Sequence, residues 1–263
     1  MDLGLKDKVA IVAGGNKGFG AACAHRLGAE GTRLFLTGRN ADDLENVAVG
    51  IRDAHGVDVA TLSQDLLETD GGDKVVAAAI ERFGALDIMV SSVGASGGGV
   101  FWEIPDQVWM DSFGLKFMAN VRMMRAAVAP MRAQKSGRMV VIVGQLGKQP
   151  HPRILPSATA NAALLAALKG LADEVAGEGV IINAVNPGPS RTERWNRLME
   201  NLARDTGRPV AEAEADFTTD IPMGRFGEPD EIARHVCFLA SDAAGYMTGT
   251  SVTADGGWIK FPA

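Results

Sequence analysis

The chain has 263 residues, of which 46% are hydrophobic and 22% charged, and this composition is ordinary for a folded globular protein. Its 32 acidic and 26 basic side chains give a net charge of −6, which argues against a nucleic-acid-binding surface. No apolar run approaches the roughly 18 residues of a membrane span, and residues 1–8 hold no charged segment followed by an apolar stretch, so we expect neither a membrane span nor a secretory signal.

Short apolar runs alternate with helical patterns along the chain. The apolar runs predict strands at 9–13, 34–37, 57–62, 86–91, 139–143, 180–185 and 250–253. The helical patterns lie at 21–30, 41–54, 70–83, 109–132, 157–176 and 230–239. Such alternation is typical of parallel strands that are buried on both faces. We therefore predict an α/β fold, a single doubly wound Rossmann domain over residues 1–263 with a parallel seven-stranded sheet and helices on both faces.

Two segments interrupt the alternation. Residues 94–99 are rich in glycine, and residues 188–229 form a long insertion with an amphipathic pattern near 193–204. Both follow the carboxyl ends of strands, where open α/β sheets bind ligands, so the insertion is predicted to be a lid. The two cysteines, Cys23 and Cys237, fall in apolar helical patterns and predict buried thiols in a reducing, cytoplasmic compartment.

A glycine-rich loop joins the first predicted strand to the first helix. It reads Ala13-Gly14-Gly15-Asn16-Lys17-Gly18-Phe19-Gly20. Glycine lets the backbone turn tightly and approach a pyrophosphate, while the helix N-terminus offers unpaired N–H groups and a positive dipole end. The loop is therefore predicted to cradle the phosphates of a dinucleotide.

The residues after the second strand bear on the choice of cofactor. NAD-binding chains carry an acidic residue roughly 20 positions past the loop, where it holds the ribose 2′-hydroxyl. Residues 31–41 contain no acid; Arg39 follows the strand and Lys17 lies in the loop. Two cations suit a 2′-phosphate, so NADP(H) is the preferred cofactor and NAD(H) the alternative. Asp65, after the third strand, fits either an adenine contact or a helix N-terminal acid.

Several spaced motifs together resemble the short-chain dehydrogenase/reductase family over nearly the whole chain. They are the glycine loop, Asp65-Leu66, the asparagine in Met118-Ala119-Asn120-Val121, the run from Asn183 to Gly188 followed by Thr192, and the segments 227–229 and 254–257. Ala13 stands where the family has threonine, and Ser91-Ser92-Val93-Gly94 where it has Asn-Asn-Ala-Gly. With the loop, the resemblance implies cofactor-binding roles for Gly14, Asn16, Lys17, Gly18, Phe19, Gly20, Arg39, Asp65, Leu66, Ser92, Gly94, Pro187, Gly188 and Thr192.

The catalytic positions depart from that family. The resemblance implies a serine after the fifth strand and a Tyr-x-x-x-Lys pair on the next helix, but this chain has Gly144, Ser157 and Asn161 there. Asn120 matches the catalytic-helix asparagine, and both a role in the proton path and a structural role are open for it. We assign these four residues as the catalytic set. The only tyrosine, Tyr246, lies far downstream and is expected to serve packing.

The altered set leaves three functions open. A carbonyl that receives a hydride needs a proton, and serine is a far weaker acid than a lysine-activated tyrosine. First, the chain is an NADPH-dependent reductase of a small carbonyl or enone compound whose acid is Lys148, His151, a lid residue or a relayed water. Second, it reduces a conjugated C=C bond, and donors near Gly144, Ser157 and Asn120 stabilise the enolate. Third, it is a catalytically idle NADP-binding sensor or scaffold.

Partners follow mainly from the resemblance. Besides a small-molecule substrate, it implies a homo-oligomer, a dimer or tetramer, formed through the predicted helices 109–132 and 157–176. The four histidines lie in unrelated contexts without ligand spacing, so we expect no metal site.

Overall fold

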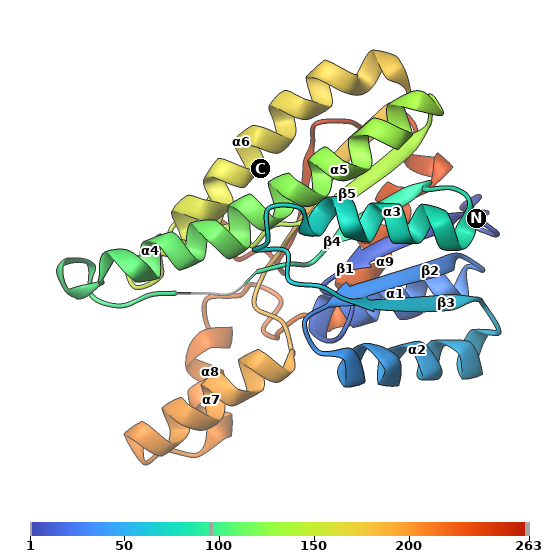
Figure 1. Ribbon diagram of the computed structural model, residues 1–263. Helices are drawn as coiled ribbons and strands as arrows, with labels where there is room; N and C mark the ends of the chain where they lie inside the picture. The colour runs from blue at the N-terminus through green and yellow to red at the C-terminus, as the bar shows by residue number, and fades with distance from the viewer. Residues whose placement is uncertain (1, 95–96, 261–263) are drawn as a thin grey trace.

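The computed structural model describes residues 2–94 and 97–260 (Figure 1). Its seven strands form one sheet in the order β3-β2-β1-β4-β5-β6-β7, and every neighbouring pair is parallel. The strands are β1 (Val9–Ala13), β2 (Arg33–Gly38), β3 (Val59–Ser63), β4 (Ile88–Ser91), β5 (Gly137–Ile142), β6 (Val180–Pro187) and β7 (Ser251–Ala254). The predicted seven-stranded parallel sheet is confirmed.

The strand order reverses at the centre of the sheet. β1 pairs with β2 on one side and with β4 on the other, so Ala13 lies beside both Thr37 and Ser91. The connections from β1 and from β4 therefore leave in opposite directions and open a crevice at the carboxyl ends of the strands. The glycine loop lies at this point.

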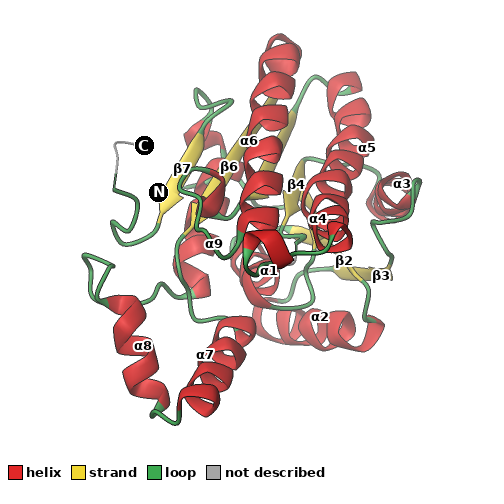
Figure 2. Cartoon of the chain, turned by 90° about the vertical axis from the view of Figure 1, so that its left-hand side faces the viewer, coloured by secondary structure: helices red, strands yellow, loops and turns green. Residues whose placement is uncertain are grey.

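Helices cover both faces of the sheet (Figures 1 and 2). On one face lie α1 (Gly18–Ala29), α2 (Ala41–His55) and α9 (Pro229–Ala240), and on the other α3 (Gly71–Phe83), α5 (Ala119–Ala133) and α6 (Leu155–Val175). Side chains of β1 alternate between the two cores, because Ile11 packs with α3 and α5 while Val12 packs with α1. Cys23 and Cys237 are buried as predicted, and burial raises the pKa of Cys237 to about 12.

The helix predicted at 109–132 has a more complex form. It begins as α4 (Asp106–Ser112), passes through a π-helical segment at Phe113–Met118 and continues as α5. π-Helical turns of this kind are frequent at functional sites. Here the wide turn comes immediately before Ala119 and Asn120.

The insertion contains two helices, one more than predicted. α7 (Glu193–Thr206) has the expected amphipathic pattern, and α8 (Val210–Thr218) follows after a short turn. Figure 2 shows both helices lying apart from the helices that cover the sheet. The glycine-rich segment 94–99 includes two positions outside the described residues.

Within residues 2–94 and 97–260, none of the helices combines the length and the apolarity needed to cross a bilayer. The same part of the chain brings no three His, Cys, Asp or Glu side chains together in a metal-binding group.

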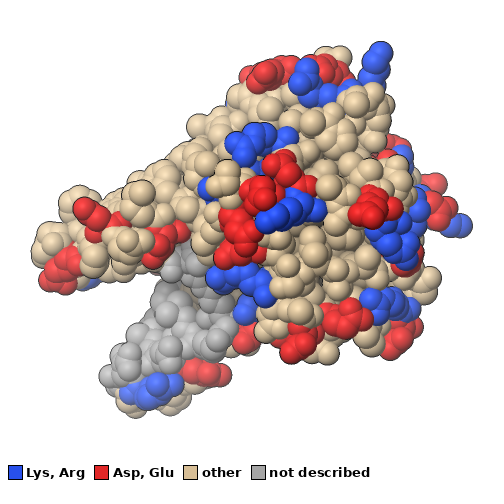
Figure 3. Space-filling view, in the orientation of Figure 1, with Lys and Arg blue, Asp and Glu red and all other residues tan. Residues whose placement is uncertain are grey.

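Figure 3 shows acidic and basic side chains interspersed over one face. The predicted pairing of this chain with further copies stays a prediction.

Candidate active site

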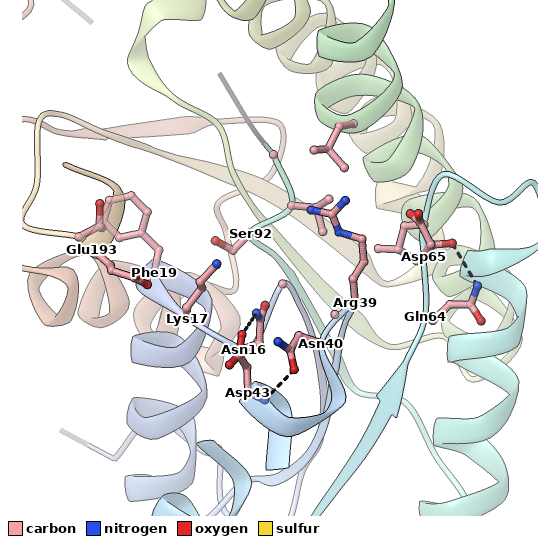
Figure 4. Close-up of a pocket in the computed structure, with 18 residues that line it drawn as sticks. Asn16, Lys17, Phe19, Arg39, Asn40, Asp43, Gln64, Asp65, Ser92 and Glu193 are labelled. Atoms are coloured by element: carbon pink, nitrogen blue, oxygen red, sulfur yellow. Dashed lines mark hydrogen bonds between the residues drawn. The ribbon is translucent and has the colours of Figure 1, made fainter. Parts of the chain in front are cut away.

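A cleft of about 390 Å³ opens where the strand order reverses (Figure 4). It is lined by the residues that follow β1, β2, β3 and β4, and by the start of α7. Most of the predicted cofactor-binding residues meet here: Gly14, Asn16, Lys17, Gly18, Phe19, Arg39, Asp65, Leu66, Ser92, Gly94 and Thr192. The cleft also takes in residues that the sequence analysis missed: Gly38, Asn40, Asp43, Gln64, Val93, Leu115 and Glu193.

The glycine loop has the backbone form that a phosphate cradle needs. Gly14 and Gly18 have φ angles of +75° and +55°, in the region that favours glycine. A Cβ on Gly14 would lie 2.9 Å from the Ser92 carbonyl oxygen, so a side chain here would collide with the end of β4. α1 begins at Gly18, and its first residues line the cleft. The loop therefore fits a pyrophosphate at a helix N-terminus.

Three predicted cofactor residues lie outside the cleft lining. A Cβ on Gly20 would lie 2.0 Å from the Gly14 carbonyl oxygen, so glycine here lets α1 pack against the loop. Pro187 ends β6 beside Ala254, and a Cβ on Gly188 would lie 2.7 Å from the Cα of Asp255. Packing alone accounts for glycine at positions 20 and 188, and the cofactor contacts of these three residues stay predictions.

The end of the cleft that we predict to hold the adenosine ribose is lined by residues of both signs of charge. Lys17 and Arg39 reach it from the glycine loop and from the end of β2 (Figure 4). Asp43, in the first turn of α2, lines the same cleft, and its Oδ2 accepts a hydrogen bond of 3.4 Å from Asn16 Nδ2. Asn40 caps α2, because its Oδ1 accepts from the Asp43 N–H at 3.1 Å. Residues 31–41 contain no acidic side chain, but Asp43, two positions further along the chain, lines the cleft.

The end of the cleft where we predict adenine to bind contains a tight turn after β3. Asp65 Oδ1 accepts a 2.9 Å hydrogen bond from the Leu67 N–H. Leu66 is buried, and its carbonyl oxygen accepts from Arg122 Nη1 at 3.1 Å. One carboxylate oxygen of Asp65 thus stabilises the turn. Because α3 begins only at Gly71, the alternative of a helix N-terminal acid is wrong, and the contact of Asp65 with adenine stays a prediction.

Asn120 ties β4 to the long helix. Its Oδ1 accepts from the Ser91 hydroxyl at 2.6 Å, and its Nδ2 donates to the carbonyl oxygens of Val93 and Lys116 at 3.2 and 2.7 Å. The side chain is 1% exposed. Because both amide hydrogens are used within the protein, these contacts support the structural alternative for Asn120 over the proton-path one.

Gly144 and Asn161 fit one another. Both Asn161, on α6, and the adjoining Gln145 are buried. A Cβ on Gly144 would lie 2.9 Å from Asn161 Nδ2, and a Cβ on Gly147 would lie 2.9 Å from the Asn161 backbone carbon and Cβ. The amide of Asn161 therefore fills the space into which a side chain at position 144 would project. Glycine at position 144, which has no side chain, makes room for this amide.

Ser157 is covered by the glycine-rich segment. Its Oγ accepts a hydrogen bond from the Gly97 N–H at 3.0 Å and donates to the Gly97 carbonyl oxygen at 3.3 Å. The Gly99 N–H donates to the Arg153 carbonyl oxygen at 2.9 Å, and a Cβ on Gly98 would lie 2.2 Å from the same oxygen. The backbone of residues 97–99 thus lies against the first turn of α6, at the side chain that replaces the family's tyrosine.

The other acid candidates are placed differently from one another. Lys148 Nζ donates to the Ser251 carbonyl oxygen and the Thr253 hydroxyl, each at 3.1 Å, and burial lowers its pKa. His151 is exposed, and its Nδ1 accepts from the Arg153 N–H. Lys148 therefore holds β7 and is not directed freely at the cleft.

The expectation that Tyr246 serves packing is wrong. Tyr246 is the most exposed of the large hydrophobic and aromatic side chains in the described part of the chain. It follows Gly245 in the turn between α9 and β7, where the chain runs over the surface. The sequence position alone carried no signal for this exposure.

The predicted lid begins at the edge of the cleft. Thr192 lines the cleft and caps α7, because its Oγ1 accepts from the Trp195 N–H at 3.3 Å. Arg191 pairs with Glu214 of α8 at 3.0 Å. The start of α7 therefore joins the insertion to the nucleotide cleft.

The fold and the cleft define a Rossmann-type dinucleotide-binding domain. Over residues 13–259 the chain matches a family model described as enoyl-(acyl carrier protein) reductase. The chain belongs to the short-chain dehydrogenase/reductase family.

Individual relatives cover almost the whole chain. The NADPH-dependent reductase BacG of Bacillus subtilis is 28% identical over 97% of this chain and 99% of its own. The short-chain reductase protein NovJ of Streptomyces niveus is 32% identical over 96% of this chain and 94% of its own. Among solved structures, L-sorbose reductase from Gluconobacter frateurii, complexed with NADPH and L-sorbose, superposes with a TM-score of 0.96 at 31% identity and full coverage of both chains.

Proposed function

We propose that this chain is an NADPH-dependent reductase of a small carbonyl or conjugated enone compound, and that it works without a tyrosine acid. The observation that carries the proposal is a cleft in which most of the predicted cofactor residues meet, together with an altered catalytic corner, by which we mean Gly144, Ser157 and Asn161. The cleft brings together the glycine loop, Lys17 and Arg39. The corner holds Asn161 and Ser157 in buried, close-fitting positions.

The cofactor assignment is supported by the charges at the ribose end. A 2′-phosphate is an acceptor of charge-assisted hydrogen bonds, and Lys17 and Arg39 are the cations that line the described part of the cleft. BacG and L-sorbose reductase, by their names, use or hold NADPH. When bound, this cofactor supplies a hydride to an electrophilic carbon.

We assign to Asn161 the role of a hydrogen-bond donor to the substrate oxygen. Its Nδ2 lies beside Gly144, in the space that a serine side chain would take in the family's usual set. An amide donor that is already oriented stabilises a developing negative oxygen without transferring a proton. Ser157, whose hydroxyl is bonded to both backbone groups of Gly97, then holds the loop over the corner.

Reduction of a conjugated C=C bond is the second candidate. The lack of a phenol at position 157 favours it, because an enolate needs stabilisation of its oxygen more than an immediate proton. The description of the matching family model, an enoyl reductase, agrees with this candidate. The two candidates differ in the bond that is reduced and share the cleft.

A matched substrate panel separates the candidates. Each conjugated enone is tested beside its saturated ketone, with loss of NADPH absorbance as the rate and mass spectrometry of the product. Consumption of the enone alone, giving the saturated ketone, supports C=C reduction, whereas alcohol products support carbonyl reduction. Asn161→Ala should lower turnover at least tenfold while NADPH affinity stays within about twofold, since one oriented donor contributes about 10²-fold or more in acyl-transfer enzymes. NADPH binding without turnover on any pair would leave the idle sensor or scaffold as the function.

A further inference from the structure

Asp43 is one of the acidic residues that line the cleft with the two predicted cofactor cations. It lies in the first turn of α2, half-buried, and lines the cleft together with Lys17 and Arg39 (Figure 4). Its neighbour Asp42 carries the same charge in the same helical turn, but it is exposed and is not among the residues that line the cleft. Helix stabilisation by an acidic first turn therefore accounts for both residues, but it does not account for the position of Asp43 in the cleft.

Asp43 determines which end of the Asn16 amide faces the nucleotide. An ionised carboxylate only accepts hydrogen bonds, so the NH₂ end of Asn16 must turn toward it. The 3.4 Å contact between Asn16 Nδ2 and Asp43 Oδ2 shows this arrangement. The amide oxygen then points toward Gly38, where a Cβ would lie 2.9 Å from it, and Gly38 lines the same end of the cleft.

An oxygen at this place suits a hydroxyl better than a phosphate. A ribose hydroxyl can donate to the Asn16 oxygen, whereas a 2′-phosphate presents only acceptor oxygens and negative charge. The carboxylate of Asp43 adds a second repulsive charge beside Lys17 and Arg39. Both effects act against the phosphorylated nucleotide and leave the unphosphorylated one unaffected or favoured.

We infer that Asp43 is a positioning and specificity residue that lowers the preference of this cleft for NADPH over NADH, by holding the Asn16 amide oxygen toward the ribose and by adding negative charge. The inference rests on the proposed use of a dinucleotide cofactor. It predicts that the cleft binds NADH as well as NADPH, although two cations line it.

Binding of nucleotide fragments tests the inference without any substrate. Calorimetry of 2′,5′-ADP and of 5′-ADP compares ligands that differ by the 2′-phosphate. Asp43→Asn should tighten the binding of 2′,5′-ADP by about four- to sixfold, the effect of removing one unit charge roughly 8 Å from a phosphate that carries about −1.5 to −2 charges, in a largely aqueous medium. Binding of 5′-ADP should change by less than about twofold, and the gain should shrink in roughly 1 M salt, where exposed charges are screened.

Three further variants control the experiment. Asp42→Asn removes the same charge from the same helical turn and should leave both dissociation constants unchanged. Asp43→Glu restores a carboxylate and should return the ratio of the two constants toward that of the original protein. Asp43→Ser, a second neutral variant, should reproduce the gain, and circular dichroism confirms that α2 is retained in each protein.

The outcomes that would overturn the inference are distinct from failure of the proposed function. Unchanged or weaker binding of 2′,5′-ADP by both neutral variants refutes the role of Asp43, and so does an equal gain for 5′-ADP or for Asp42→Asn. If the original protein binds neither fragment, the proposed dinucleotide cleft is refuted, and the role of Asp43 with it.

Discussion

Gly144→Ala is the sharpest test of the altered catalytic corner. The new Cβ would lie 2.9 Å from Asn161 Nδ2, closer than carbon and nitrogen tolerate in a packed interior. Gly144 has a φ angle of −52°, which alanine adopts without strain, so the effect isolates the contact. Asn161 is 3% exposed, and a Cβ on Gly147 would lie 2.9 Å from the Asn161 Cβ, so this residue is closely packed.

The magnitude follows from two opposing contributions. Overpacking a close-fitted interior costs about 1–3 kcal/mol, while replacing glycine by alanine stabilises by about 0.4–1 kcal/mol through the unfolded chain. We therefore expect Gly144→Ala to lower the free energy of unfolding by about 1–2 kcal/mol. Gly177→Ala is the matched control, because no atom lies within 4 Å of its Cβ position and its φ angle is not positive. It should be neutral or stabilising.

Urea unfolding of a double-mutant cycle measures the contact itself. Asn161→Ala removes the amide that the new methyl group would strike. The combined variant Gly144→Ala/Asn161→Ala should therefore be more stable than the sum of the single effects by about 1–2 kcal/mol. Effects that add within about 0.5 kcal/mol would refute the proposed fit between the two positions.

Substitutions in the nucleotide cleft, at Asn120 and at Glu231 give three further predictions. Lys17→Ala and Arg39→Ala should each weaken NADPH binding about tenfold and NADH binding by much less, measured by fluorescence titration, because a charge-assisted bond to the 2′-phosphate is lost. Asn120→Ala should lower the free energy of unfolding by about 2–4 kcal/mol in urea, because one buried and two partly buried groups lose their hydrogen-bond partner. Arg225 and the Glu228 N–H lower the pKa of Glu231 from 4.5 to about 2. The resulting stability is present above pH 4.5 and is lost as the pH falls toward 2, so Glu231→Gln should flatten the acid side of a plot of stability against pH.

Much of the fold could be predicted because the signals are local. The run Val9–Ala13 is apolar throughout since β1 is buried on both faces, and the structure places a strand over those same residues. The glycine loop follows it directly, and Gly14 and Gly18 have the positive φ angles that their identity suggested. Short-range patterns of this kind do not depend on the rest of the chain.

Other features of the fold and the site depend on contacts between distant parts of the chain, which the sequence alone does not reveal. The bond between Ser157 and Gly97 joins positions 60 residues apart, and no spacing rule predicts it. Asp43 lies beyond the end of β2, and it lines the cleft only because the first turn of α2 folds beside the glycine loop, which the spacing of residues does not reveal. α8 was missed because, within a polar insertion, its pattern is weaker than that of α7.

The covered Ser157 leads to a last prediction about restoring the family's usual acid. A tyrosine at position 157 must displace the Gly97 backbone, whose N–H and carbonyl oxygen both bond the serine hydroxyl. That segment is held in turn by the bond from the Gly99 N–H to the Arg153 carbonyl oxygen, and Ser157 itself is 1% exposed. Ser157→Tyr/Asn161→Lys should therefore fold less stably, by about 1–3 kcal/mol, and should gain no ketone reduction.

Steady-state rates on saturated ketones, measured beside urea unfolding, check both parts of this prediction. The single variant Ser157→Ala separates the contributions, because it removes the bonds to Gly97 without adding bulk. A stable double variant that reduces ketones rapidly would show that residues 97–99 yield easily to a phenol. In that case the corner would differ from the family's usual site only in its side chains. If the variant instead loses stability without gaining activity, the backbone of residues 97–99 has adapted to the smaller side chain, and the site is one built to work without a phenol.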